Sequence, residues 1–248
     1  FALPYLEGAK LGSTPPAATS LSNRWILSRL AQTIAAAKQG IDDFRLDDTT
    51  QALYRFVWNE LCDWYLELSK PVYAGSDEAA KQEARDVLAY VLEASLRLLH
   101  PFIPFITDEL WQLVPRPEGS GPSLCVASFP APACADAAAE REMELLMAAI
   151  GAARSVRSEH EVHPAAEVEL TFRADDAETR ALLGRELTAI RTLVKTKGDP
   201  VIAEKGAPRP KGAVMSATGS VDVLVSLIGL VDGDKEAKRV ERELAKVE

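Results

Sequence analysis

The chain has 248 residues, a length that suits one large domain and one small domain. Hydrophobic residues make up 47% and charged residues 26%, which is ordinary for a globular protein, and the lack of any run of 18 apolar residues excludes a membrane-spanning helix. The net charge of −9 argues against nucleic-acid binding through overall charge, although such binding depends on where the basic residues cluster.

Long helical patterns fill the first part of the chain. Apolar residues recur at spacings of three and four over 22–43, 48–70 and 77–99. A shorter helix is expected over 104–113, where Pro104 suits the first turn. Because short connections join these helices, the pattern predicts a mainly α fold that begins with an antiparallel helical bundle.

Individual residues predict where these helices begin and end. Ser22 is the expected N-cap of the first helix, and Ser76 is a candidate cap for the third. Asp47 and Asp48 are expected to cap the second helix. Pro71 is expected to end that second helix, because proline lacks the N–H that a helix interior needs.

Aromatic residues on these helices are candidates either for the core or for stacking on bases. Trp64 and Tyr65 lie on the apolar stripe of the second helix, and Trp58 lies beside it. Trp111 shares the stripe of the fourth helix with Ile106 and Leu110, which makes that stripe part of the expected core as well. Their positions favour the core for all four aromatic residues, least clearly for Trp58.

The pattern changes in the second half. Residues 115–135 are rich in Pro, Gly, Ser and Ala and predict a surface loop, and a helix is expected over 137–158. An alternating stretch over 168–172 predicts a strand, and 176–196 again predicts a helix. Further short strands are expected at 201–203, 213–215 and 221–227. Together these elements predict a small α+β unit.

The chain ends in a heptad-like seam. Ala237, Val240, Leu244 and Val247 step by three and four residues, which is typical of a coiled coil, although an ordinary terminal helix remains an alternative. The pattern has no stop signal, and the chain opens on Phe1 rather than Met. We therefore expect both ends to continue in a longer protein.

Residues that would indicate catalysis or metal binding are missing from the pattern. The sequence has no phosphate-binding glycine loop, no His-Glu-x-x-His and no Gly-x-Ser-x-Gly motif. His160 and His163 lack the further ligands that a metal needs, and His100 at a helix end favours a structural role. The three cysteines form no Cys-x-x-Cys pair, which favours reduced thiols in a cytoplasmic protein. We expect no catalytic residue, metal or cofactor in this chain.

Four blocks of the sequence carry a resemblance to a known family. They are NRWILSRL at 23–30, FRLD at 44–47, the run at 52–71 that contains WNELCDWYLE, and LLHPFIPFITDELW at 98–111. In this order and spacing they resemble the anticodon-binding helical bundle of class I aminoacyl-tRNA synthetases. The WNELCDWYLE block is the most specific and resembles the valyl enzymes; isoleucyl and leucyl relatives share its general shape.

The resemblance extends over nearly the whole chain and implies three parts. These are an anticodon-binding helical bundle over 1–140, a small α+β domain over 141–232 and the start of a C-terminal coiled-coil arm over 233–248. It is carried past the bundle by residues 153–159 and 227–232. The family's His-x-Gly-His and Lys-Met-Ser-Lys-Ser signatures are absent from this sequence. The resemblance therefore implies that ATP and Mg belong to a separate catalytic domain and that this part binds tRNA without catalysis.

The resemblance and the residue types together nominate candidate contacts to tRNA. Phe1 matches an aromatic residue that can stack on an anticodon base in the family. Arg154 and Arg157, three residues apart, can grip adjacent phosphates, or can instead pair with Glu159 or Glu161. Basic residues on the predicted helices are candidates too, although a solvated face or a helical ion pair is the alternative for each. They are Arg24, Arg29, Arg45, Arg55 and Lys70.

A basic stretch lies in the predicted α+β unit. Residues 185–211 hold seven basic and three acidic residues, a local net charge of +4 in an acidic chain. Such a face can meet a tRNA backbone, or it can simply be solvated. The expected partner is valine-specific tRNA, with no DNA and no membrane, and we expect a cytoplasmic monomer. The alternatives are the same bundle of an isoleucyl or related synthetase, or a non-catalytic helical protein-interaction module.

Overall fold

The computed structural model describes residues 2–133 and 135–231. It is mainly helical with one small sheet of four strands, which confirms the coarse fold prediction. The chain divides into two compact units, residues 1–143 and 144–248. Phe1 and the predicted coiled-coil helix over 233–248 lie outside the described residues, and the predicted domain limits stay predictions. No helix of the described residues is both long enough and apolar enough to cross a membrane.

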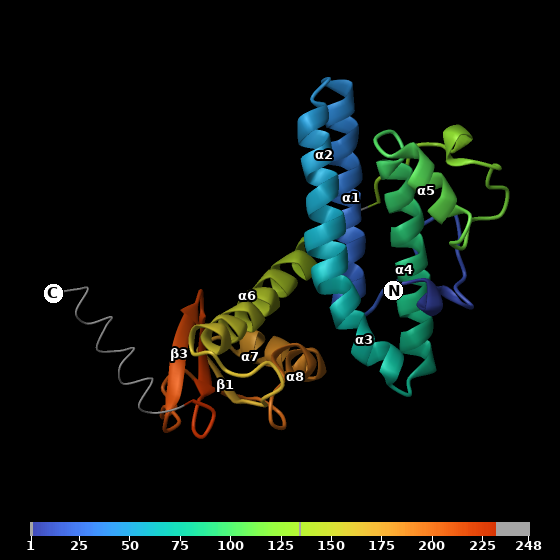
Figure 1. Cartoon of the computed structure of the whole chain (residues 1–248). Helices are drawn as coiled ribbons and strands as arrows, with labels where there is room; N and C mark the ends of the chain where they lie inside the picture. The colour runs from blue at the N-terminus through green and yellow to red at the C-terminus, as the bar shows by residue number, and fades with distance from the viewer. Residues whose placement is uncertain (1, 134, 232–248) are drawn as a thin grey trace. The chain divides into compact units, whose positions relative to one another are not determined.

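Unit 1 is built on three long helical rods that contact one another (Figure 1). The first is α1 (Leu21–Asp42). The second runs without a break through α2 (Leu46–Tyr54), the π-helix η2 (Arg55–Tyr65) and α3 (Leu66–Ala74). The third is α4 (Glu78–Leu99). These bounds confirm the existence of the three long helices that the apolar spacing predicts.

Shorter elements complete unit 1. The 3-10 turn η1 (Leu3–Leu6) contacts α4, and α5 (Pro104–Trp111) packs on the end of the same helix. The predicted loop over 115–135 carries one 3-10 turn, η3 (Leu124–Val126), beside α5. Trp111 anchors α5, because its ring is buried and its Nε1 donates to Glu93 Oε1 at 3.1 Å. Ile106 and Leu110 on α5 are exposed, so the core prediction for α5 is correct for Trp111 alone.

Several predicted helix ends are wrong by one or two residues. Ser20, not Ser22, caps α1, and its hydroxyl accepts the backbone N–H of Asn23. Asp77, not Ser76, caps α4 and accepts two backbone N–H groups. Both correct caps are short polar side chains placed one residue before the first helical turn, which is where the unpaired N–H groups lie.

The second rod departs most from its prediction. Asp47 and Asp48 lie in the first turn of α2, where they favour the helix dipole, but neither side chain caps it. The helix also continues past Pro71 to Ala74, so the prediction that Pro71 ends it is wrong. Only three residues follow this proline in α3, and the lost backbone hydrogen bond therefore falls in the final turn.

The π-helix between α2 and α3 buries one side and exposes the other. Phe56, Leu61 and Tyr65 point into the core, and the Tyr65 hydroxyl donates to Asn23 Oδ1 at 2.8 Å. Bonds between residues i and i+5 make a π-helix turn less per residue than an α-helix, so an apolar stripe drifts around it. Such segments are rare and frequently occur at functional sites. Hydrophobic spacing alone did not predict one here.

Unit 2 is a mixed sheet covered by helices. The four strands are β1 (Glu169–Ala174), β2 (Val201–Ala203), β3 (Ala213–Thr218) and β4 (Val221–Ser226). They lie in the order β2-β1-β4-β3, and only the β1–β2 pair is parallel. The predicted helix over 176–196 is two helices, broken at Glu186, where helical backbone geometry is lost just after Gly184. The helices are α6 (Ala137–Glu159), which includes the division between the units, α7 (Ala177–Arg185) and α8 (Leu187–Val194).

Candidate nucleic-acid interface

Two of the predicted RNA-contacting arginines bind carboxylates inside unit 1. Arg24 donates from Nε at 2.8 Å and Nη2 at 2.6 Å to Asp136 Oδ2. Arg29 holds both carboxylate oxygens of Glu60, at 2.9 and 2.8 Å, and lies 3.6 Å from Glu140. Paired bonds of this kind fix the planar guanidinium group in place. Both side chains therefore join helices of unit 1 to one another.

Asp136 lies at the centre of this connection. Its carboxylate accepts the backbone N–H of Ala139 at 2.9 Å, which satisfies one of the unpaired donors at the start of α6. The Ala139 N–H and, after it, the Arg24 guanidinium hold the pKa of Asp136 below its ordinary value. The start of α6 is thereby fixed on α1 by charge-assisted hydrogen bonds.

Two other predicted contacts form exposed ion pairs along their own helices. Arg45 pairs with Asp48, and the Lys70 ammonium lies 2.5 Å from Glu67 Oε1. Exposed pairs of this type contribute at most about 1 kcal/mol. The Arg45 pair is therefore weak enough for a phosphate to compete with Asp48.

Arg55 lines an open hollow on the surface of unit 1 together with Thr50, Gln51 and Tyr54. Tyr54 and Trp58 leave 62% and 56% of their surface exposed. Their rings are nearly parallel, with an interplanar angle of 11° and centroids 6.2 Å apart. The Arg55 guanidinium makes one long hydrogen bond, from Nε to the Gln51 carbonyl at 3.4 Å. We call these four residues, Gln51, Tyr54, Arg55 and Trp58, the aromatic face.

The exposure of Trp58 corrects the expectation that all four aromatic residues belong to the core. Tyr65 and Trp111 are fully buried, and Trp64 is half-buried. Trp58 is the fourth residue of the π-helix and lies in its first turn, on the exposed side. Two flat rings that face solvent beside a guanidinium group are the combination on which unpaired bases stack.

In unit 2, the Arg157 side chain is buried and joins several backbone segments by hydrogen bonds. It is 8% exposed, and its guanidinium donates to the carbonyls of Ala166 at 2.9 Å, His163 at 3.3 Å and, at 3.5 Å each, Pro164 and Lys195. Burial lowers the pKa of Arg157, which still remains charged at any physiological pH. Among the described residues it forms no ion pair with an acidic neighbour, so the pairing alternatives do not apply to it.

Arg154 is exposed but also contacts a carbonyl of unit 2. Its Nε donates to the Leu193 carbonyl at 2.9 Å, at the end of α8. Arg154 and Arg157 thus reach the same end of α8 from one side of α6, as their spacing of three predicts. Both tie α6 to the segment around Lys195. The predicted phosphate grip of these two residues is not tested by this arrangement.

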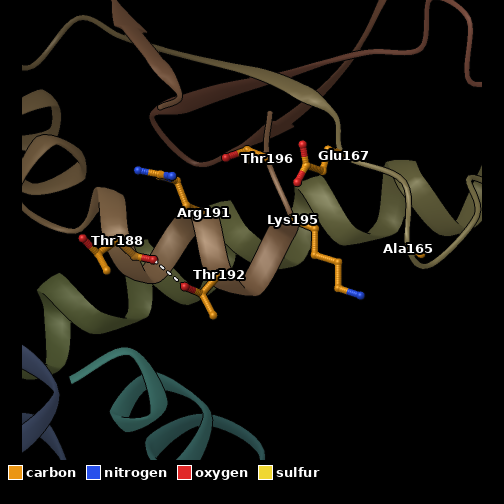
Figure 2. Close-up of a pocket in the computed structure, with 7 residues that line it drawn as sticks. All are labelled: Ala165, Glu167, Thr188, Arg191, Thr192, Lys195 and Thr196. Atoms are coloured by element: carbon orange, nitrogen blue, oxygen red, sulfur yellow. Dashed lines mark hydrogen bonds between the residues drawn. The ribbon is translucent and has the colours of Figure 1, made fainter. Parts of the chain in front are cut away.

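A cationic hollow of about 560 Å³ opens beside α8 (Figure 2). Arg191 and Lys195 supply its positive charge, and Figure 2 shows their side chains extending from α8 in different directions. Arg191 Nη1 lies 3.0 Å from Asp199 Oδ1. Lys195 ends α8 with a left-handed backbone, at a φ of 58°. The hollow is lined by Ala165, Glu167, Thr188, Arg191, Thr192, Lys195 and Thr196.

The rest of the basic stretch over 185–211 is partly used inside the fold. Arg209 donates to the Ala213 carbonyl at 2.9 Å, and the Lys197 ammonium lies 3.9 Å from Glu169. Of the seven basic residues, Arg191 and Lys195 line the hollow. Because Arg191 and Lys195 do not converge on one point, they suit separate phosphates along a backbone better than one compact anion.

The histidines show no arrangement typical of catalysis. His100 Nδ1 lies 2.9 Å from the Thr107 hydroxyl, and His163 Nδ1 accepts the backbone N–H of Ala165 at 3.1 Å. Within residues 2–133 and 135–231, no three His, Cys, Asp or Glu side chains are grouped as metal ligands would be.

Comparison with known proteins shows similarity over most of the chain. Residues 23–172 match the family described as the anticodon-binding domain of tRNA ligase. The chain is 41% identical over 238 residues to the valine–tRNA ligase of Rhizobium meliloti, covering 96% of this chain and 25% of that relative. It is 40% identical to the valine–tRNA ligase of Geobacter sulfurreducens and 41% identical to that of Stenotrophomonas maltophilia R551-3, over 100% of this chain in both comparisons and 28% and 26% of those relatives. The chain thus spans about a quarter of the length of these relatives.

Proposed function

We propose a function for this chain from one premise: it belongs to the family of anticodon-binding domains of tRNA ligases. The chain is the tRNA-gripping part of a valine–tRNA ligase, and it positions tRNA for ATP-dependent aminoacylation by a catalytic domain outside it. The relatives at about 40% identity over nearly the whole chain, each named valine–tRNA ligase, support the choice of amino acid. ATP and Mg²⁺ act in that catalytic domain, and no residue of this chain takes part in the chemistry.

Unit 1 is the helical bundle of class I synthetases, and its aromatic face receives the anticodon loop. An unpaired RNA loop exposes bases that can be splayed out and stacked on aromatic side chains. Tyr54 and Trp58 offer such surfaces without any loss of core packing, because their rings are already exposed. Arg55 adds a cation beside the rings, which strengthens stacking and attracts the RNA backbone.

Cations of unit 1 and unit 2 set the register on the tRNA backbone. Arg45 and Lys70 exchange weak ion pairs with their own helices for contacts to phosphates. In unit 2, Arg191 and Lys195 of the cationic hollow contact the backbone of a stem. The acceptor end of the tRNA is thereby oriented in a distant active site, which converts binding energy into positioning.

The remaining candidate arginines support these surfaces through contacts within the protein. Arg24 and Arg29 hold α6 on α1, and Arg157 and Arg154 hold the segment that ends α8. We assign them the task of keeping the RNA-binding side chains in position. The protein acts as a cytoplasmic monomer, and Phe1 with the C-terminal arm adds contacts beyond those described for this chain.

The match over residues 23–172 carries this proposal, and a salt titration tests it. Binding of the 248-residue chain to a valine tRNA transcript is measured by filter retention between 50 and 200 mM salt, a window in which about six phosphate contacts weaken affinity about 1,000-fold. We expect the logarithm of the binding constant to fall linearly with the logarithm of salt concentration. Failure to bind the transcript at the lowest salt would contradict the proposal.

A protein-interaction module is a second candidate, and the exposed apolar side chains of α5 favour it. Phe105 is 92% exposed, and Ile106 and Leu113 also face solvent. Such a cluster is typical of a protein contact. A protein partner bound there would depend little on salt, whereas tRNA binding depends on it steeply. A chain from an isoleucyl enzyme would instead prefer isoleucine tRNA in the same assay.

A further inference from the structure

A second hollow lies in unit 1, where the N-terminal segment runs along α4. Its volume is about 310 Å³, which is near the lower end for small-molecule sites. Two backbone contacts hold its wall on α4: Gln82 Nε2 donates to the Gly8 carbonyl at 3.0 Å, and the Lys10 N–H donates to Asp86 at 2.6 Å. The wall is therefore preformed. The lining residues are Pro4, Tyr5, Glu7, Gly8, Tyr73 and Arg85.

Two tyrosine rings form one side of this hollow. The rings of Tyr5 and Tyr73 stack with centroids 4.3 Å apart and an interplanar angle of 18°. Because the rings lie face to face, the pair, which we call the platform, offers a base the outer face of one ring. A flat, partly exposed aromatic surface accepts any base, because every base has a π face.

The Tyr73 hydroxyl is left without a hydrogen-bond partner. It is buried and makes no hydrogen bond in the structure. Burial raises the pKa of Tyr73 to about 12, so the group keeps its proton and remains a donor at neutral pH. An unsatisfied buried polar group costs about 1–3 kcal/mol. A small shift of the platform towards a bound acceptor would remove that cost.

Arg85 supplies a cation that the fold does not use. No hydrogen bond or ion pair to its guanidinium is formed among the described residues, whereas Arg24 and Arg29 each hold carboxylates at short distance. Its charge acts on both Tyr73 and Glu78. A guanidinium group in this state is a ready donor pair for a phosphate.

Glu7 places one carboxylate on the same hollow, opposite in sign to Arg85. A carboxylate repels a bare anion, so the set disfavours free phosphate as the ligand. It accepts hydrogen bonds from the exocyclic amino group of a base such as cytosine. The hollow thus combines an aromatic ring for stacking, a guanidinium that can donate hydrogen bonds to a phosphate, and a carboxylate that can accept them from an amino group.

We propose that this hollow binds one unstacked nucleotide of an RNA loop, with its base on the Tyr5–Tyr73 platform, its phosphate on Arg85 and its amino group on Glu7. The proposal deepens the tRNA-binding function and rests on it. It assigns to the chain a base-binding site besides the aromatic face. The carboxylate makes the site prefer bases with an amino group, such as cytosine, over uracil.

Charge-matched variants of the 248-residue chain test the phosphate contact. Arg85→Gln removes the proposed contact, and Arg141→Gln removes an exposed arginine of the same unit that lines neither hollow. We expect the Arg85 variant to bind the valine tRNA transcript about 10-fold more weakly and to lower the salt slope by about 1. The Arg141 variant should stay within about 2-fold of the original chain. Arg85→Lys keeps the charge and should bind more tightly than Arg85→Gln. This result would attribute the weaker binding of Arg85→Gln to a lost contact and not to misfolding.

The results distinguish this proposal from the function on which it rests. If the original chain binds the transcript and the Arg85 and Arg141 variants bind equally well, the hollow is not a nucleotide site although the chain binds tRNA. If the original chain binds no tRNA, the function itself is wrong and the hollow proposal is overturned with it. A circular-dichroism melt of each variant confirms that it is folded.

Mononucleotides test the base contact separately. Cytidine 5′-monophosphate, uridine 5′-monophosphate and inorganic phosphate are titrated into the chain, and binding is followed by NMR of the ligand. We expect cytidine monophosphate to bind at least about 5-fold more tightly than the other two, which corresponds to roughly one hydrogen bond. Glu7→Gln should reduce this preference, and Tyr73→Phe should weaken cytidine and uridine monophosphate alike. Equal binding of all three probes would overturn the proposal.

Discussion

On unit 1, the aromatic face presents two exposed rings and one guanidinium group. On unit 2, the cationic hollow presents Arg191, Lys195 and threonine hydroxyls without any aromatic ring. Rings stack on bases, whereas cations and hydroxyls contact phosphates and sugars. In the proposed function, the aromatic face therefore meets bases, whereas the cationic hollow sets the register on the backbone.

The two regions also differ in what holds them. The aromatic face lies on the outer side of a helix whose inner side is packed in the core through Phe56, Leu61 and Tyr65. The hollow instead depends on Arg157, a buried side chain that donates to carbonyls around Lys195 and Ala165. Packing supports the first region and a network of polar contacts supports the second.

The largest expected effect comes from removing that polar support. Arg157→Ala removes a buried guanidinium that donates to the carbonyls of Ala166, His163, Pro164 and Lys195, and we expect the free energy of unfolding of unit 2 to fall by about 3 kcal/mol. A thermal melt checks this. Equal stability of the Arg157 variant and the original chain would show that the hollow does not depend on this side chain.

Trp58 provides the next largest effect, this time on binding alone. Trp58→Ala should weaken binding to valine tRNA about 10-fold or more, because stacking contributes about 1–3 kcal/mol per base. The stability should change by less than about 0.5 kcal/mol, since the ring is exposed. Trp58→Phe keeps an aromatic ring and should retain most of the affinity. If Trp58→Ala binds normally, the aromatic face does not meet bases.

The start of α6 gives a smaller effect with a pH signature. Asp136→Ala removes the contact to Ala139 and should cost about 1 kcal/mol of stability. Because the folded pKa of Asp136 is lowered, its stabilisation is present above the unfolded value of about 3.9 and is lost as pH falls through the folded pKa. The difference between variant and original chain should therefore shrink below about pH 4. Urea denaturation at pH 7 and at pH 2.5 checks both statements, and a difference that persists at low pH would contradict them.

The smallest effect separates the two regions most cleanly. Replacing both Arg191 and Lys195 by Gln should weaken tRNA binding only a few-fold at moderate salt. It should, however, reduce the magnitude of the salt slope by about 2, because two phosphate contacts are lost. Trp58→Ala should leave that slope unchanged. A double variant with the original slope would mean that the hollow faces solvent and not RNA.

The sequence predicted the helices well because their evidence is periodic. The structure confirms the helices predicted over α1 and α4, with ends shifted by one or two residues. The ends are harder to predict because a cap depends on a single side chain, and several serines and aspartates are candidates for it. The four-strand unit followed from alternation around Leu170 and Val223, both of which are buried. Where buried positions recur at a regular spacing, the apolar pattern of the sequence is sufficient to predict the helix or strand.

The candidate site was predicted less well, for a physical reason. The basic residues were visible in the sequence, but whether Arg24 or Arg157 is used inside the fold depends on Asp136 and on carbonyls that lie far away in the chain or carry no sequence signal. The π-helix that turns Trp58 outward also leaves no periodic trace. The close Tyr5–Tyr73 stack joins segments that only the tertiary fold brings together.

A comparison of two tRNAs tests the central claim most directly. Valine tRNA and the same transcript with only its anticodon replaced are each titrated with the 248-residue chain in one low-salt buffer. We expect the natural anticodon to bind at least about 10-fold more tightly, which corresponds to about 1.4 kcal/mol of contacts to bases. Equal affinity for both transcripts would contradict anticodon recognition and leave only binding to the backbone.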